Sequence, residues 1–147
     1  MTRVDFYILT ETDPKSRLPF ACRLAEKAYR QGHKVFIQAK EVEALEIDEL
    51  LWQHKPESFL PHNILGEGPN APPPIQIGYG QNAGKHRDVL INLTDDVPDF
   101  FNQFKRVAEI VPQDEALKQK SRICYQRYRK EGCDLHSHNI AANITAN

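Results

Sequence analysis

The sequence predicts an α/β domain built on a parallel β-sheet, and three observations support this fold class. Short apolar runs rich in β-branched and aromatic residues alternate with longer segments of helical periodicity. The first two runs, 4–9 and 33–39, are separated by one helix-length segment, the spacing of two parallel strands joined by a crossover helix. The run 88–93 is almost continuously apolar, which is typical of a strand buried on both faces.

Local signals place the elements along the chain. Asp13 followed by Pro14 is typical of an N-cap and a first helical residue, and Gly32 suits the end of that helix. A second helix must stop before Pro56, because proline cannot continue the helical hydrogen bonding. The expected series is strand 4–9, helix 14–31, strand 33–39, helix 41–54, loop 56–69, strand 75–77, Gly-rich segment 78–85, strand 88–93, helix 98–107, strand 108–111, a basic helix within 111–132 and an edge strand 133–136.

No internal repeat and no long linker divides the 147 residues, so a single domain is expected over residues 1–137. A chain of this length buries roughly two-thirds of its unfolded surface, which is enough for one domain core. The polar residues 138–147 are expected to form a flexible tail.

The composition is that of an ordinary globular protein, with 27% charged residues and a net charge of −1. A near-neutral chain does not coat nucleic acid through its whole surface, but a local basic patch is compatible with this charge. Cys22, Cys124 and Cys133 form no C-x-x-C pair and no even set, which argues against a disulfide scaffold and favours a cytoplasmic location. The first residues are too polar for a signal peptide, and no apolar run approaches the ~20 residues that span a bilayer.

The Gly-rich segment 78–85 does not meet the requirements of a phosphate-binding P-loop. Gly80 and Gly84 are too close in sequence for that motif, and Lys85 is followed by His86 where the motif needs Ser or Thr. The segment also leads into a strand, so it presents no helix N-terminus to a phosphate. The sequence therefore predicts no nucleotide site and no other cofactor.

A second group of residues, Cys133, His136 and His138, has side chains that zinc accepts as ligands. No fourth ligand is evident, and the spacing matches no common structural zinc motif, so no metal site is expected. The sequence also contains neither a G-x-S-x-G elbow nor an H-E-x-x-H motif. We therefore expect no catalytic residues.

The last long helix has a lopsided charge, because residues 116–130 carry six Lys or Arg and no acid. One stripe, which includes Cys124 and Tyr128, has the spacing of a side that faces the core. A second stripe repeats this spacing one residue later and is basic and aromatic: Lys118, Arg122, Tyr125 and Arg129.

The second stripe suits a partner that brings both a carboxylate and an apolar group. Arginine binds carboxylates bidentately, and tyrosine supplies apolar contact area. The alternative is a solvated basic face that only interacts with the helix dipole.

Three segments carry a resemblance to a known family: LLWQHKPESFLPHNILGEGP at 50–69, RDVLINL at 87–93 and FKRVAEIVPQDEALKQKSRICYQRYRKEGCDL at 104–135. In this order and spacing they resemble the chi subunit of the bacterial DNA polymerase III holoenzyme, and the likeness covers nearly the whole chain. The resemblance implies a Rossmann-like three-layer sandwich, with a mainly parallel central sheet, helices on both faces and no nucleotide site. It also implies an accessory polymerase subunit without its own active site.

The resemblance implies two protein partners. Members of the family pair with the psi subunit, which tethers them to the clamp loader. They also bind the acidic C-terminal tail of single-stranded DNA-binding protein, which ends in a proline and a phenylalanine. Contact with single-stranded DNA is then indirect, and no membrane is involved.

The resemblance also implies positions for the tail site. These are Arg122 for the terminal carboxylate, Tyr125 and Val111 for the phenylalanine, Lys118 and Arg129 beside them, and Gln126 where a familiar relative has a lysine.

The psi subunit is expected to contact the loop after the second helix. Trp52 and Phe59 flank a proline turn, and large aromatic residues are the types that anchor interfaces. Pro61, His62 and Asn63 follow and complete the expected interface. The alternative for the two rings is burial in the core.

Two other functions stay open on the residues alone. The first is a nucleotide-dependent enzyme on the same kind of sheet, which rests on analogy of fold. The second is direct binding of single-stranded DNA by the basic helix through charge and stacking. The near-zero net charge and the lack of a second aromatic platform make the second less favoured.

Overall fold

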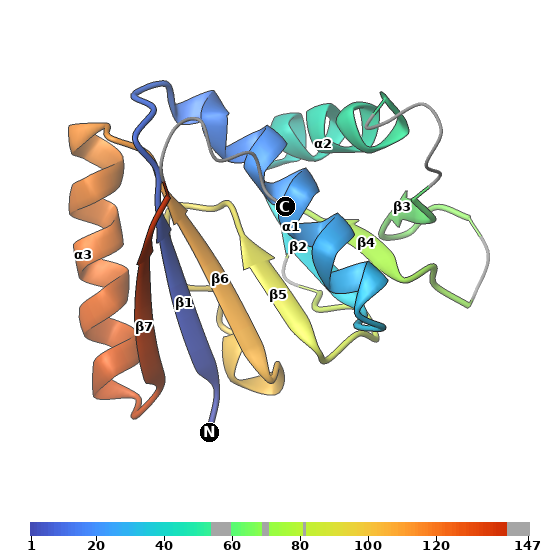
Figure 1. Cartoon of the computed structure of the whole chain (residues 1–147). Coiled ribbons are helices and arrows are strands. Elements are labelled where there is room, and N and C mark those ends of the chain that lie inside the picture. Colours follow the sequence, from blue (N-terminus) through green and yellow to red (C-terminus); the bar gives the residue numbers. More distant parts are fainter. Residues whose placement is uncertain (54–59, 69–70, 81, 141–147) are drawn as a thin grey trace.

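The computed structural model describes residues 1–53, 60–68, 71–80 and 82–140. Within these residues, seven parallel strands form one sheet in the order β3-β4-β2-β5-β6-β1-β7 (Figure 1). The predicted α/β class with a parallel sheet is therefore confirmed. The strands are β1 (Arg3–Ile8), β2 (Val35–Gln38), β3 (His62–Ile64), β4 (Ile75–Gly78), β5 (Val89–Asn92), β6 (Arg106–Val111) and β7 (Asp134–Asn139).

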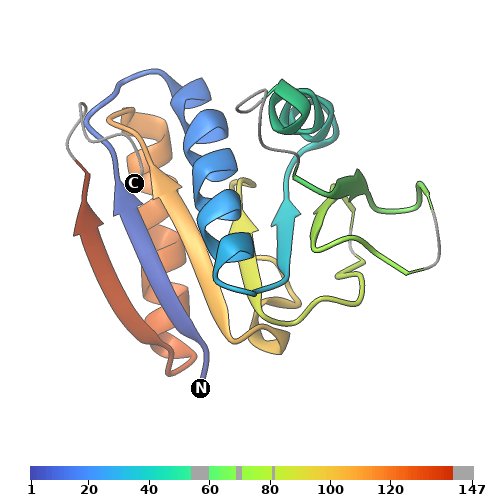
Figure 2. The same cartoon turned by 45° about the vertical axis from the view of Figure 1, so that its right-hand side comes forward.

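Helices cover both faces of this sheet, as a Rossmann-like sandwich requires. The helices α1 (Arg17–Arg30) and α2 (Glu41–Gln53) lie on one face, and α3 (Glu115–Lys130) lies on the other (Figure 2). One core forms under α1 and α2, and a second forms under α3. None of the helices in the described ranges combines the length and the apolar character needed to cross a membrane.

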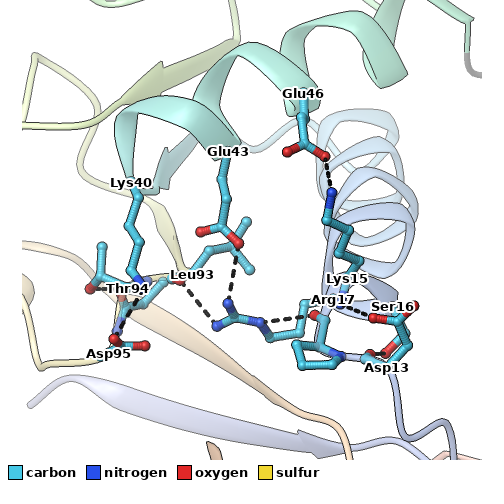
Figure 3. A network of polar contacts seen from close by, with 12 residues as sticks. Asp13, Lys15, Ser16, Arg17, Lys40, Glu43, Glu46, Leu93, Thr94 and Asp95 are labelled. Carbon is cyan, nitrogen blue, oxygen red and sulfur yellow. Dashed lines mark hydrogen bonds and ion pairs between the residues drawn. The ribbon is translucent and has the colours of Figure 1, made fainter.

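Arg17, the first residue of α1, connects three elements although only 6% of its surface is exposed (Figure 3). Its Nη1 donates to the carbonyl of Leu93, just after β5, at 3.0 Å, and its Nη2 lies 3.3 Å from Glu43 Oε2 on α2. A buried guanidinium needs such acceptors, because an unpaired charge in a protein interior is costly. These contacts therefore fix α1 and α2 relative to the sheet.

The predicted start and end of the first helix are confirmed, except that its first three residues form a 3-10 turn. Asp13 caps a 3-10 turn, Pro14–Ser16, by accepting a hydrogen bond from the Lys15 amide at 2.9 Å, and α1 follows this turn directly. Gly32 has a φ of 87°, a conformation that glycine adopts without strain. The sequence signals therefore located both helix ends.

The predicted helix over 98–107 is wrong. This segment contains one 3-10 turn, Phe101–Gln103, and β6 begins within it. The aromatic side chains fill the second core instead: the Phe101 ring lies 5.2 Å from that of Tyr128 on α3. Pairing of β6 with both β5 and β1 outweighs the helical spacing of these phenylalanines.

Both edges of the sheet differ from expectation. His62–Ile64 form the short strand β3 within the segment that was predicted as a loop. The expected strand 133–136 is longer than predicted, because β7 runs from Asp134 to Asn139 along β1. No residue of β7 is fully buried, so this polar strand lacks the apolar pattern by which strands are recognised.

A carboxyl group is buried beneath α3. Glu109 on β6 is 7% exposed, and its Oε2 accepts hydrogen bonds from Tyr128 Oη at 2.6 Å and from Asn92 Nδ2 at 2.8 Å. Burial raises the pKa of Glu109 to about 7, although both hydrogen bonds and the charge of Arg17 oppose this shift. The helix and the sheet are thus joined through a side chain that changes its charge near neutral pH.

Replacing Glu109 by glutamine should remove a pH dependence of stability. The folded state holds the Glu109 proton more tightly than the unfolded chain, whose ordinary pKa is 4.5, so this stabilisation is complete below that value and is lost as the pH rises to about 7. The loss is on the order of 3 kcal/mol. Urea denaturation of wild type and Glu109→Gln at about pH 5 and about pH 8 measures it, and parallel pH profiles would contradict the assignment.

Candidate functional site

The helix α3 has clear signals at both ends. Asp114 at the N-cap has an extended backbone, and its Oδ2 accepts from the Leu117 amide at 3.0 Å. Gly132, with a φ of 82°, follows the last turn, where three cations face the negative end of the helix dipole. The helix is therefore fixed in length and position by its own sequence.

The predicted core stripe of α3 packs against β1 and β6. Cys124 and Tyr128 are buried, and Phe6 of β1 lies between Tyr125 and Tyr128, with ring centroids at 5.4 and 6.1 Å. Tyr125 is only partly buried, so one side of its ring remains available at the edge of the helix.

A pocket of about 280 Å³ lies between α3 and the ends of β1, β6 and β7. Five of the six residues that were expected at the tail site line it, and Arg129 does not. β1 supplies two further apolar side chains, and polar residues close the remaining sides. The lining consists of Val111, Lys118, Arg122, Tyr125, Gln126, Phe6, Ile8, Gln113, Ser121 and Ser137.

The cations of α3 differ in whether they already contact an acidic residue. Lys120 pairs with Asp95 at 2.8 Å and Arg127 lies 3.8 Å from Asp99, so these cations are engaged outside the pocket. Within the described part of the chain, Arg122 has no hydrogen-bonded acceptor, and Lys118 has only a 3.6 Å contact with Glu115. An apolar floor beside two available cations can bind a carboxylate that is attached to an apolar group.

Five residues of the pocket were not predicted: three lie on strands, Gln113 lies between β6 and α3, and Ser121 lies on α3 itself. Phe6 and Ile8 are on β1, and Ser137 is on β7, which is more than a hundred residues away in sequence and pairs with β1. Gln113 bridges the ends of β1 and β6, because its Nε2 donates to the Leu9 carbonyl at 2.9 Å. Alternation along β1 puts Phe6 and Ile8 on the same face, and this was the available signal.

The second expected surface is partly described. Trp52, at the end of α2, is 57% exposed and is therefore not buried in the core, and its ring lies 4.6 Å from that of His62. His62 itself is buried, with Nδ1 at 2.6 Å from the Leu60 carbonyl and Nε2 at 3.3 Å from Asp48. The predicted contact Phe59 lies outside the described residues.

The other two residues expected at this surface adjoin His62. Pro61 is half-buried directly before β3. The Asn63 side chain donates to the Glu67 carbonyl at 2.7 Å and accepts from Gln76 Nε2 at 3.1 Å. The structure therefore places Trp52 at the surface, whereas His62 and Asn63 support the strand edge below it.

Two glycines of the Gly-rich segment, Gly78 and Gly84, are required by close packing, whereas Gly80 has open space around it. A Cβ atom at Gly78 would lie 2.3 Å from the Phe36 ring, and one at Gly84, where φ is 64°, would lie 2.8 Å from Gln76 Oε1. These positions allow the loop to cross close over β2 and β4.

Both histidines of the Cys133, His136 and His138 group contact carboxylates instead of forming a shared site. His138 binds Asp5 at 2.8 Å, and His136 lies 3.1 Å from Asp134. Among the residues that the structure describes, no group of three potential metal ligands is found.

The fold and the pocket together define a class: a small Rossmann-like α/β protein with a surface pocket that has a cationic rim and an apolar floor. Residues 1–136 match the family model described as DNA polymerase III chi subunit, HolC. The chain therefore belongs to the DNA polymerase III chi subunit family, whose members are accessory subunits of a replicative polymerase.

Individual relatives agree with this family. The chain is 45% identical to the DNA polymerase III subunit chi of Pseudomonas aeruginosa over 141 residues, which cover 95% of this chain and 98% of the relative. It is 43% identical to that of Haemophilus influenzae over 137 residues, covering 92% and 95%. It is 36% identical to that of Escherichia coli over 143 residues, covering 93% and 97%.

Removing the N-cap of α3 should weaken the helix that carries the pocket. Asp114→Ala should lower the free energy of unfolding by about 1 kcal/mol, because the Leu117 amide loses its acceptor. Asp114→Asn is the matched control, since asparagine also caps helices and should retain most of the stability. Urea denaturation compares the three proteins, and an equal loss in both variants would show that the cap is not the cause.

Proposed function

We propose that this protein is a non-catalytic adaptor of the cytoplasmic replicase. It connects the clamp loader, through the psi subunit, to the acidic C-terminal tail of single-stranded DNA-binding protein. The observation that carries the proposal is the pocket beside α3, where Arg122 and Lys118 lie next to an apolar floor. A chain end that carries a carboxylate, further acids and a terminal phenylalanine matches both features.

Each lining residue has a role in this proposal. Arg122 binds the terminal carboxylate, because a guanidinium without an internal acceptor can form a bidentate pair. The phenylalanine ring packs on Tyr125 and Val111, and Lys118 attracts the acids that precede it. Gln126 contributes a neutral amide at the rim.

Arg129 has a different role because it does not line the pocket. Arg129 is exposed one turn after Tyr125 on α3. It is near enough to the pocket to attract the acidic residues of the tail, but it does not contact the terminal phenylalanine. We therefore assign Arg129 to long-range attraction, which salt screens.

The psi subunit has a candidate surface on α2. Trp52, Leu45 and Val42 are 57%, 58% and 67% exposed, and their spacing puts all three on one side of this helix. Large apolar side chains are rarely exposed together on one helix unless they meet a partner. The buried His62 ring under Trp52 holds the indole in place, so the anchor is pre-positioned.

Arg122→Ala should weaken binding of the tail. Losing a charge-assisted contact costs about 1–3 kcal/mol, which is a roughly 5- to 150-fold increase in Kd. The measurement is calorimetric titration of a peptide with the last residues of single-stranded DNA-binding protein into each protein. A peptide without its terminal phenylalanine should bind poorly to both.

Arg127→Ala is the matched control for this titration. It removes the same side chain from the same helix, but Arg127 points to Asp99 and does not line the pocket. Its Kd should stay close to the wild-type value at moderate salt. Equal affinities of wild type and Arg122→Ala would remove Arg122 from the site.

Trp52→Ala should abolish co-purification with the psi subunit while leaving the tail peptide titration unchanged. Trp52 is the largest of the exposed apolar side chains on this surface, and large aromatic side chains commonly carry most of the binding energy of an interface. Ile123→Ala is the control, because Ile123 on α3 is 71% exposed and removing it tests loss of exposed apolar area elsewhere. Full recovery of the complex with Trp52→Ala would place the psi contact on another surface.

A further inference from the structure

A second cavity lies on the face of the sheet opposite α3. On this face α1 lies over the middle of the sheet, and no helix of the described chain covers β1 and β7 (Figure 2). The cavity has a volume of about 390 Å³ and lies between α1 and the strands β1, β5 and β6. It is separated by the thickness of the sheet from the pocket that holds Arg122.

The walls of this cavity are largely apolar. Tyr7 on β1 and Phe20 on α1 pack with ring centroids 5.5 Å apart, and Leu24 and Ala108 continue the apolar surface. Ile140, the residue after β7, closes one end. Small-molecule sites in proteins have this size and this apolar lining with a few polar groups.

The charged groups of the cavity do not balance. Arg23, Lys27 and Arg106 line it with three positive charges, and Asp5 supplies one negative charge, which leaves an excess of two. Asp5 is already occupied, because it accepts from His138 at 2.8 Å and from Arg106 at 2.9 Å. Burial alone would raise the pKa of Asp5, but these hydrogen bonds together with that from Arg3 lower it, so it stays ionised and engaged.

Arg23 is the group that lacks an acceptor. Its Nε is buried, and no described residue accepts a hydrogen bond from it. The guanidinium instead lies over the Phe20 ring, 5.8 Å from the centroid. Arg23 lines the cavity, and its guanidinium has no acceptor among the described residues, so it can form a charge-assisted contact with an anion in the cavity.

We propose that this cavity is a second binding site that takes a small organic anion. A carboxylate or phosphate of the ligand pairs with the guanidinium of Arg23 and with Lys27 at the opening. Its apolar body lies on Tyr7, Phe20 and Leu24. This site does not depend on the tail site, because the two share no lining residue.

The test uses four probes and the isotope-labelled full chain. Phenyl phosphate and 3-phenylpropionate carry both parts of the proposed ligand and distinguish phosphate from carboxylate. Inorganic phosphate carries only the charge, and 3-phenylpropanol carries only the apolar body. Saturable shifts of the Arg23 Nε–H and the Ala108 amide resonances are expected with at least one of the first two probes, at concentrations up to about 10 mM.

Variants locate the binding. Arg23→Gln and Lys27→Gln should each raise the Kd of the bound probe roughly tenfold, as expected for loss of a charge-assisted contact. Lys27 is exposed, so Lys27→Gln reports on the site even where Arg23→Gln disturbs the fold. Arg122→Ala should leave probe binding unchanged, and Lys27→Gln should leave the tail peptide titration unchanged. Failure of one site is thereby distinguished from failure of the other.

Three results would overturn the proposal. Absence of saturable shifts with both anions means that the cavity does not bind a small organic anion. Equal binding of 3-phenylpropanol means that the site does not select an anion. Equal binding of inorganic phosphate means that the apolar walls contribute nothing to recognition.

Discussion

The hydrogen bond from Tyr128 to Glu109 holds α3 in register on the sheet, and the pocket beside α3 depends on that register. Both side chains are buried, and the 2.6 Å contact joins the last helix to a central strand. The residues that face the pocket, Arg122 and Tyr125, are one to two turns away on the same rigid helix. A rotation of α3 would move them away from Phe6 and open the floor of the pocket. Apolar packing is not directional, whereas this buried hydrogen bond specifies one position of α3 on the sheet.

The net charge is −1, but the acidic and the basic residues are concentrated on different helices. α2 carries five acids and no Lys or Arg, whereas α3 carries six Lys or Arg and one Glu. The two helices lie on opposite faces of the sheet (Figure 1), so the acidic helix and the basic helix form separate surfaces, although α1, on the same face as α2, is itself basic. Electrostatic attraction of this kind chiefly raises the rate of encounter and excludes partners of the wrong charge. Two partners with different charge can therefore approach without competing for one surface.

The sequence predicted what depends on local signals. The parallel sheet, the cap at Asp13 and the basic stripe of α3 all follow from periodicity and end residues. It failed where contacts distant in sequence decide the outcome. The predicted helix over 98–107 was wrong because β6 begins in this segment and pairs with its neighbouring strands. The predicted strand 133–136 was shorter than β7 because the polar residues of β7 adopt their extended conformation only by pairing with β1. Three of the ten residues that line the pocket, Phe6, Ile8 and Ser137, were missed for the same reason, since β1 and β7 meet α3 only in the folded chain.

The position of β1 has a consequence for how the chain reaches this state. β1 is the first strand made, yet both of its neighbours, β6 and β7, come from the last third of the sequence. A nascent chain still attached to the ribosome therefore holds β1 with both hydrogen-bonding edges open until β6 emerges, and with one edge open until β7 follows. A long loop must close before such distant strands can pair, and contacts that are distant in sequence slow folding. Translation that stops before β6 would release an unpaired apolar strand, the kind of segment that associates with other chains.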